Sequence, residues 1–158
     1  MIKVGDKIPE GKVAKIAAQG AGLINTREFF AGKKVVMFGV PGAFTPTCSE
    51  KHLPGFVALA DRLKAKGVSD IVCLSVNDRH VMNAWAKDQN VGDKVLMLAD
   101  GRGDFTKALG MDIDHETLGL RSKRFAVIVD NGVVKHVALE ENTGAHSVSS
   151  AESILKHL

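Results

Sequence analysis

Four short runs of apolar residues, separated by segments with helical spacing, constrain this fold more than any other feature. They are rich in Val, Ile and Leu, and they span Lys34 to Val40, Asp70 to Val76, Val95 to Ala99 and Phe125 to Asp130. Continuous apolar runs of this length are typical of strands buried on both faces. After the last run, Asn131-Gly132 leads into Val133 to Leu139, and this dipeptide favours the type I′ turn of a hairpin. The sequence therefore predicts at least one antiparallel pair.

The segments between these runs favour helices. One helix is indicated by apolar residues three and four positions apart that stop at Gly67, namely Leu53, Phe56, Val57, Ala60 and Leu63. Further helices are predicted from Asn77 or Asp78 through Trp85, over Asp104 to Leu109, and after a capping box at Ser149 to Glu152. Gly20 to Gly22 is interpreted as a loop. Alternating strands and helices followed by a hairpin predict an α/β fold with a central mixed β-sheet flanked by helices.

Length and composition limit the class of protein. The 158 residues are close to the ~150 of an average domain, so we expect a single domain over residues 1–158. Hydrophobic residues make up 45% and charged residues 25%, which excludes disorder and coiled coils. The net charge of +3 comes from scattered basic residues, and we expect no nucleic-acid partner. Apolar runs far shorter than ~20 residues and a polar N-terminus predict a soluble chain without a membrane span or signal peptide.

Cysteine and histidine usage argues against bound metals and structural disulfides. Two cysteines are too few for a disulfide scaffold, which favours a reducing compartment such as the cytoplasm. The six histidines show no metal-ligand spacing and the cysteines form no CxxC pair, so we expect no metal or other cofactor.

The segment from Gly39 to Glu50 carries the chemistry. It runs from the carboxyl end of a predicted strand, through a turn fixed by Pro46, into a helix whose first turn contains Cys48. Free N–H groups and the positive end of the helix dipole stabilise a thiolate there, so Cys48 is predicted to be reactive. The alternative interpretation is an ordinary small core residue, which is the usual fate of a free cysteine.

Pro41, Thr45 and Cys48 form the PxxxTxxC signature, and through it the chain resembles the peroxiredoxins. The stretches VPGAFTPTCSEKHLPGF, CLSVNDRHVMNAW, LADGRGDFTKALG and RSKRFAVIVDNGVV extend the resemblance over nearly the whole chain, and they look like the type II, or peroxiredoxin-five-like, subfamily. The resemblance implies a thioredoxin-like fold. It also implies a thiol-dependent peroxidase that reduces hydrogen peroxide and alkyl hydroperoxides through a cysteine sulfenic acid.

The resemblance assigns a role to each site residue. Cys48 attacks the peroxide, Thr45 hydrogen-bonds the sulfur and the substrate, and Pro41 shields the site from water. The family's distant arginine is matched by Arg124, which directly precedes a phenylalanine as in the family, with Arg121 as the nearby alternative. An arginine suits this task because its planar, permanently charged group offers several donors to the sulfur and to the peroxide oxygens. For Thr45 alone, the alternative is a hydroxyl that caps a turn.

The reductant and the partners are expectations from the same comparison. Cys73 lies in a buried strand, and we expect it to be structural, although some relatives carry a cysteine at this position. The sulfenic acid is then reduced by an external thiol, from glutathione with glutaredoxin or from thioredoxin. The resemblance implies a homodimer, with Phe44 as a candidate contact. His52, one turn after Cys48, is interpreted as a solvated helix histidine, with tuning of the thiolate as the alternative.

Two further alternatives stay open at the level of sequence. On the same fold, Cys48 could serve a non-catalytic redox sensor or a chaperone-like binding protein, in which oxidation alters partner binding. A plastid or mitochondrial matrix location after removal of a transit peptide is the alternative to the cytoplasm. Apolar side chains on loops expected near the site favour bulky alkyl hydroperoxides, and these are Phe44, Leu118, Leu120 and Phe125.

Overall fold

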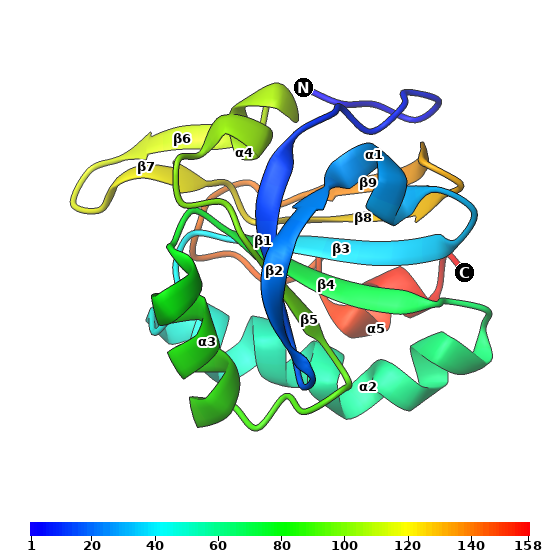
Figure 1. The fold of residues 1–158 in the computed structure, drawn as a ribbon, viewed down its shortest axis with the longest axis horizontal. Helices are drawn as coiled ribbons and strands as arrows, with labels where there is room; N and C mark the ends of the chain where they lie inside the picture. The colour runs from blue at the N-terminus through cyan, green and yellow to red at the C-terminus, as the bar shows by residue number, and fades with distance from the viewer.

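The computed structural model describes residues 1–158 and contains a seven-stranded sheet and a separate two-stranded sheet (Figure 1). The elements, in chain order, are β1 (Lys12–Ala17), β2 (Gly20–Asn25), α1 (Thr26–Phe30), β3 (Lys34–Val40), the helical turn η1 (Cys48–His52), α2 (Leu53–Ala65), β4 (Asp70–Ser75), α3 (Arg79–Asp88), β5 (Leu96–Ala99), α4 (Asp104–Ala108), β6 (Asp112–His115), β7 (Gly119–Ser122), β8 (Phe125–Asp130), β9 (Val133–Leu139) and α5 (Ala151–Leu155). The order across the large sheet is β2-β1-β5-β4-β3-β8-β9. None of the helices has the length and apolar character needed to cross a bilayer.

The large sheet is mixed, as the sequence predicts. The strands β3, β4 and β5 pair in parallel, whereas β8 pairs antiparallel with both β3 and β9. All four apolar runs are strands of this sheet. The β8–β9 turn places Asn131 at φ +49° and Gly132 at φ +76°, which is the left-handed backbone that a type I′ turn requires. The predicted hairpin is therefore confirmed.

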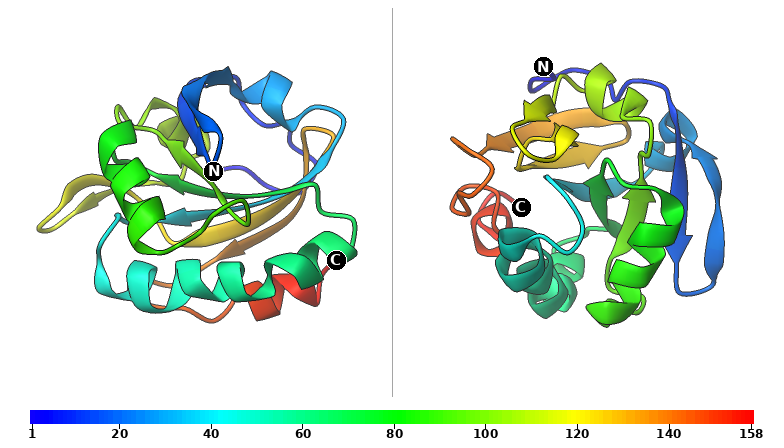
Figure 2. Two further views of the ribbon diagram at one scale, coloured as in Figure 1. Left: turned by 60° about the horizontal axis from the view of Figure 1, so that its bottom comes forward. Right: turned by 90° about the vertical axis from the view of Figure 1, so that its left-hand side faces the viewer.

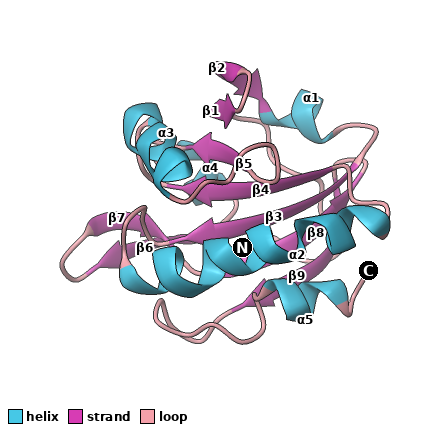
Figure 3. Ribbon diagram, turned by 90° about the horizontal axis from the view of Figure 1, so that it is seen from below, coloured by secondary structure: helices cyan, strands magenta, loops and turns pink.

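The sheet separates two apolar cores. The helices α2, α3 and α5 cover one face, and α1, α4 and the β6–β7 hairpin lie on the other (Figures 2 and 3). Strand β3 supplies both cores because successive side chains alternate between faces: Val36 and Phe38 join the α2 side, and Val35 and Met37 join the opposite side. Cys48 belongs to the core on the α2 side, so its surroundings are largely apolar.

Sequence patterning missed the two peripheral hairpins. Gly20 to Gly22, interpreted as a loop, is the start of β2, which pairs antiparallel with β1 along its full length. Most of β2 is exposed at the sheet edge, so no apolar periodicity marks it. The final helix is capped by Ser150, whose hydroxyl accepts from the N–H of Ser153 at 3.1 Å. Ser149, the predicted start of the capping box, instead donates its hydroxyl to Glu140.

Candidate active site

The loop that begins at Pro41 is held at the carboxyl end of β3 by the neighbouring parallel strand. Ala43 N–H donates to Asn77 Oδ1 at 3.0 Å, and the Ser75 hydroxyl donates to the same oxygen at 2.5 Å. Ser75 ends β4, so Asn77 ties the loop to the adjacent strand end. The sequence pattern indicates Asn77 only as a possible helix start, because a side chain that accepts from a distant backbone N–H leaves no local pattern.

Cys48 lies in the first helical turn after this loop, as predicted. The turn begins with Ser49 N–H donating to the Thr45 carbonyl at 2.9 Å. From Cys48 to His52 the helix widens into a π turn, in which Leu53 N–H donates to the Cys48 carbonyl. Single π turns inside helices are frequent at functional sites. Trp85 on α3 braces the turn, because its Nε1–H donates to the Ser49 hydroxyl at 3.0 Å.

Arg124 is the residue that meets the sulfur. Its Nη2 donates to Cys48 Sγ at 3.0 Å across 76 positions of sequence, and Arg124 and Cys48 are buried, with 2% and 0% of their surface exposed. Two further bonds fix the guanidinium: Nε donates to the Thr143 carbonyl at 2.8 Å, and Nη1 bonds His52 Nδ1 at 2.9 Å. The guanidinium therefore places a fixed positive charge beside the sulfur.

Thr45 and Pro41 frame the same turn. The Thr45 hydroxyl donates to the Gly42 carbonyl at 2.7 Å, so it caps the turn, which is the alternative predicted for this residue. That bond leaves the lone pairs of the hydroxyl oxygen available to an incoming donor. Pro41 is buried directly after β3. The structure thus brings all four predicted site residues to the loop and turn around the buried sulfur.

Comparison with known proteins identifies the family. The redoxin family profile matches residues 3–155. The chain is 49% identical to peroxiredoxin-2C of Oryza sativa over 160 residues, which covers 99% of this chain and 98% of the relative. The chain is a peroxiredoxin. It is also 47% identical to the chloroplastic peroxiredoxin-2E of Arabidopsis thaliana, covering 99% of this chain and 69% of the relative.

A solved structure of a relative agrees with this assignment. Reduced Prx3 of Vibrio vulnificus, in complex with H2O2, superposes with a TM-score of 0.93 at 51% identity and covers 99% of each chain. The resemblance to the type II group and the thioredoxin-like fold are therefore confirmed. This peroxiredoxin is accordingly a thiol-dependent peroxidase that acts on peroxides with a thiol reductant.

The nearby alternative, Arg121 on β7, lies beside Gly42 of this loop. Its Nη1 donates to the Val76 carbonyl at 3.4 Å and its Nε to the Leu118 carbonyl at 3.2 Å. A methyl group added to Gly42 would lie 2.9 Å from this Nη1, so the glycine leaves room for the guanidinium. Neither bond of Arg121 reaches Cys48, and Arg124 makes the sulfur contact.

The interpretation of His52 as a solvated helix histidine was wrong. The side chain is fully buried, its ring packs against Phe38 at a centroid distance of 4.9 Å, and its Nε2 bonds the Ser149 carbonyl at 2.9 Å. The widened turn places His52 on the buried side of the helix, where it contacts Arg124. The spacing of four positions from Cys48 to His52 indicates burial only weakly. The residues that His52 bonds, Arg124 and Ser149, are distant in sequence, so they give no local signal.

Cys73 is buried as predicted, in the middle of the sheet. It lies opposite Phe38 of β3 and Met97 of β5, with none of its surface exposed, and it is a free thiol. Burial raises the pKa of the Cys73 thiol well above its usual value, and the nearby Cys48 raises it further. Cys73 is therefore held as a neutral thiol in the folded state.

The expected apolar wall around the site is only partly present. Phe44 is exposed over 54% of its surface with a left-handed φ of +63°, and Leu118 lies on the exposed end of the β6–β7 hairpin. Phe125, in contrast, is buried in the core on the opposite face of the sheet, where its ring packs onto Gly39. Placing Phe125 in the wall was therefore wrong, because the first residue of β8 points away from the α2 side.

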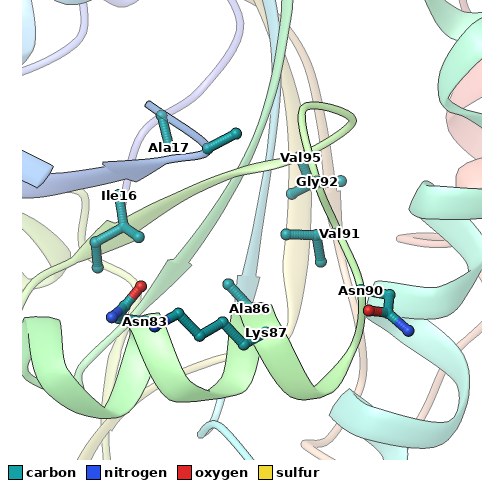
Figure 4. A pocket seen from close by; sticks show the side chains of 10 residues that line it. Ile16, Ala17, Asn83, Ala86, Lys87, Asn90, Val91, Gly92 and Val95 are labelled. Atoms are coloured by element: carbon teal, nitrogen blue, oxygen red, sulfur yellow. The ribbon is translucent and has the colours of Figure 1, made fainter. Parts of the chain in front are cut away.

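One surface cavity lies away from these residues (Figure 4). It has a volume of about 350 Å³ and lies between the end of β1, α3 and the segment before β5, lined by residues such as Ile16, Asn83, Lys87 and Val95. Its lining contains no cysteine, histidine, carboxylate or predicted site residue. This cavity is therefore separate from the contact between Cys48 and Arg124.

Proposed function

We propose that Cys48 is the nucleophile of the peroxidase, with Arg124 and Thr45 stabilising the reacting atoms and Pro41 excluding water. One observation carries this assignment: the buried guanidinium of Arg124 donates to Cys48 Sγ at 3.0 Å. In this water-poor site the fixed cation orients the sulfur and stabilises negative charge on the reacting atoms.

The reaction is a displacement at oxygen. The Cys48 thiolate donates an electron pair to the nearer oxygen of ROOH, the S–O bond forms and the O–O bond breaks. The sulfur is oxidised to the sulfenic acid, the peroxide is reduced, and the leaving RO⁻ takes a proton from solvent to become ROH. Hydrogen peroxide and alkyl hydroperoxides both fit this scheme, and the Vibrio relative supports the first because its structure is named as a complex with H2O2.

The polar groups around the sulfur are placed to stabilise the negative charge as it shifts during the reaction. Negative charge leaves the sulfur and develops on the departing oxygen, so a donor that spans both atoms stabilises the transition state more than the ground state. The fork of Arg124 has this shape. Thr45 accepts the peroxide O–H on its free lone pairs, and buried Pro41 keeps competing water away.

We infer that an external thiol, from glutathione with glutaredoxin or from thioredoxin, recycles the enzyme. A first thiol displaces water from the Cys48 sulfenic acid and forms a mixed disulfide, and a second thiol releases Cys48 and leaves as the disulfide. Cys73 is held in the central strands β3, β4 and β5, so a bridge to Cys48 requires local opening.

We propose a homodimer in which Phe44 contacts the second copy. An exposed aromatic side chain on a strained loop residue beside the active site supports this placement. We also propose a cytoplasmic location, with a plastid or mitochondrial matrix as the alternative, since the Arabidopsis relative is named as chloroplastic.

Steady-state peroxide consumption with added glutathione and glutaredoxin, or with thioredoxin and its reductase, tests the assignment. We expect sustained turnover that Cys48→Ser abolishes, and a peroxide rate constant lowered roughly 100-fold in Thr45→Val through loss of a polar contact to the reacting oxygen. Oxidation of Cys48 without turnover under every reductant would instead identify a redox sensor or a chaperone-like binding protein.

A further inference from the structure

His52 lies between the catalytic arginine and the segment that follows β9. Its Nδ1 is 2.9 Å from Arg124 Nη1, and its Nε2 is 2.9 Å from the Ser149 carbonyl oxygen. The ring is fully buried and packs against Phe38 and Phe56. Both ring nitrogens are therefore engaged, and neither one bonds the Cys48 sulfur.

The two partners determine where the ring carries its proton. A carbonyl oxygen only accepts, so Nε2 must carry the hydrogen that it donates to Ser149. Nδ1 then holds a lone pair, and it accepts from Arg124 Nη1. Burial lowers the pKa of His52, the charge of Arg124 lowers it further, and the resulting value is about 3. His52 is thus a neutral acceptor throughout the physiological range.

Neutral acceptors matter because Arg124 has no carboxylate partner. Apart from Cys48 Sγ, its side-chain donors are accepted by the Thr143 carbonyl and the His52 ring, and none of the four ion pairs of the structure includes it. A buried guanidinium without an acidic partner keeps its full charge for whatever negative group it meets. The group that it meets is Cys48 Sγ.

Ser149 is itself held by a buried carboxylate, through its N–H and its hydroxyl. Glu140 accepts from the Ser149 N–H at 2.7 Å and from its hydroxyl at 2.6 Å, and it also accepts from Ser147 N–H at 2.8 Å. Burial raises the pKa of Glu140, and the bonds from Ser149 and Ser147 more than offset this, giving a value of about 2. The carboxylate therefore stays ionised and is satisfied by these serines; the backbone N–H of Glu140 donates to the Arg124 carbonyl at 3.0 Å, but its carboxylate forms no ion pair with the guanidinium.

We propose that His52 is a positioning residue of the peroxidase: it holds the Arg124 guanidinium against Cys48 as an uncharged acceptor and leaves the positive charge for the sulfur and the peroxide. The proposal rests on the role of Arg124 proposed above. His52 transfers no proton in this scheme. The proposal requires two properties of His52, a hydrogen-bond acceptor at Nδ1 and the absence of negative charge, and substitutions can test each property separately.

Three substitutions separate them. In His52→Asn the side-chain oxygen takes the place of Nδ1, in His52→Asp the same shape carries a negative charge beside Arg124, and in His52→Leu the acceptor is removed. His80, which is exposed on α3, supplies the control His80→Leu. The rate of Cys48 oxidation is followed in single-turnover stopped flow through Trp85, the only tryptophan, whose indole contacts the catalytic turn through Ser49.

We expect His52→Leu and His52→Asp to lower the peroxide rate constant about 10- to 100-fold, as misplacing or neutralising a catalytic group does. His52→Asn should retain most of the rate, and His80→Leu all of it. The pH profile of Cys48 alkylation should move upward in the Asp variant, which adds a negative charge near the thiolate, and stay in place in the Asn variant. The other titratable groups that influence His52 are His146, with ring centroids 5.2 Å apart, and Glu140, and both are unchanged in every variant.

A double-mutant cycle decides whether His52 acts through Arg124. In the Arg124→Ala background, His52→Leu should cause little further loss, because there is no guanidinium left to position. Additive losses, equal rates for the parent and His52→Leu, or equal rates for the Asn and Asp variants would overturn the proposal. An unchanged rate in Arg124→Ala alone would overturn the proposed role of Arg124 instead, so the two failures are distinguishable.

Discussion

Folding stability should fall as the pH drops from about 7.5 to about 5, and His52 should account for much of the loss. The unfolded chain carries a histidine that protonates near its ordinary pKa of 6.5, whereas burial and the Arg124 charge lower the pKa of folded His52 to about 3. Between these values the unfolded state binds one proton more than the folded state. Stability is therefore complete above the unfolded pKa and decreases as the pH falls toward the folded one.

The size of this effect follows from the unfolded value alone, as long as folded His52 stays neutral. At about pH 5 the unfolded histidine is roughly 1.5 pH units below its pKa, and each unit corresponds to about 1.4 kcal/mol, so the cost is ~2 kcal/mol. The pKa of His146 is also lowered, by burial and by Arg124, and that of His136 by burial and His157, so the parent protein loses more than this. The contribution of His52 is the difference between parent and variant.

Urea unfolding at a series of pH values measures that difference. The free energy of unfolding of the parent should fall by ~2 kcal/mol more than that of His52→Asn between about pH 7.5 and about pH 5. His80→Leu removes an exposed histidine and should follow the parent. Parallel curves for the parent and His52→Asn would refute a buried, neutral His52.

Three further outcomes are expected. Arg124→Ala should slow peroxide attack about 100-fold or more, and Arg124→Lys should slow it less, because the lysine ammonium keeps the charge but not the planar fork of donors. Arg121→Ala should react at nearly the parent rate. Equal stopped-flow rates for Arg124→Ala and Arg121→Ala would contradict this. Cys73→Ser should retain most of the turnover supported by glutaredoxin, and peroxide without added thiol should oxidise Cys48 to the sulfinic acid. A stoichiometric Cys48–Cys73 disulfide detected by mass spectrometry, together with an inactive Cys73→Ser variant, would instead show that Cys73 is catalytic. Phe44→Asp should shift sedimentation from dimer to monomer without unfolding, and an unchanged sedimentation coefficient would remove Phe44 from the interface.

Local chemistry explains which parts of the fold were predictable. The β8–β9 hairpin follows from Asn131-Gly132, because both positions need a left-handed backbone that these residues adopt easily. Buried strands such as β3 follow from their apolar runs. The edge strand β2 has neither signal, since it begins with Gly20-Ala21-Gly22 and is mostly exposed.

The active site was predictable only in part, for a different reason. Cys48 and Thr45 lie in one short motif, so the turn itself places them. Arg124 is 76 positions away, and only the family resemblance singled it out. The acceptors that hold Arg124 and His52 include the backbone carbonyls of Thr143 and Ser149, which every residue type possesses. Such contacts depend on tertiary packing and leave no signal in the sequence.

The most direct test of the account is to locate the first oxygen that peroxide adds to the protein. The reduced protein is mixed with less than one equivalent of hydrogen peroxide, trapped with a sulfenic-acid reagent and analysed by peptide mass spectrometry. The mechanism predicts one trapped sulfenic acid, on Cys48, formed at the rate of the Trp85 fluorescence change and strongly slowed in Arg124→Ala. Trapping on Cys73, or formation on Cys48 at an equal rate without Arg124, would contradict it.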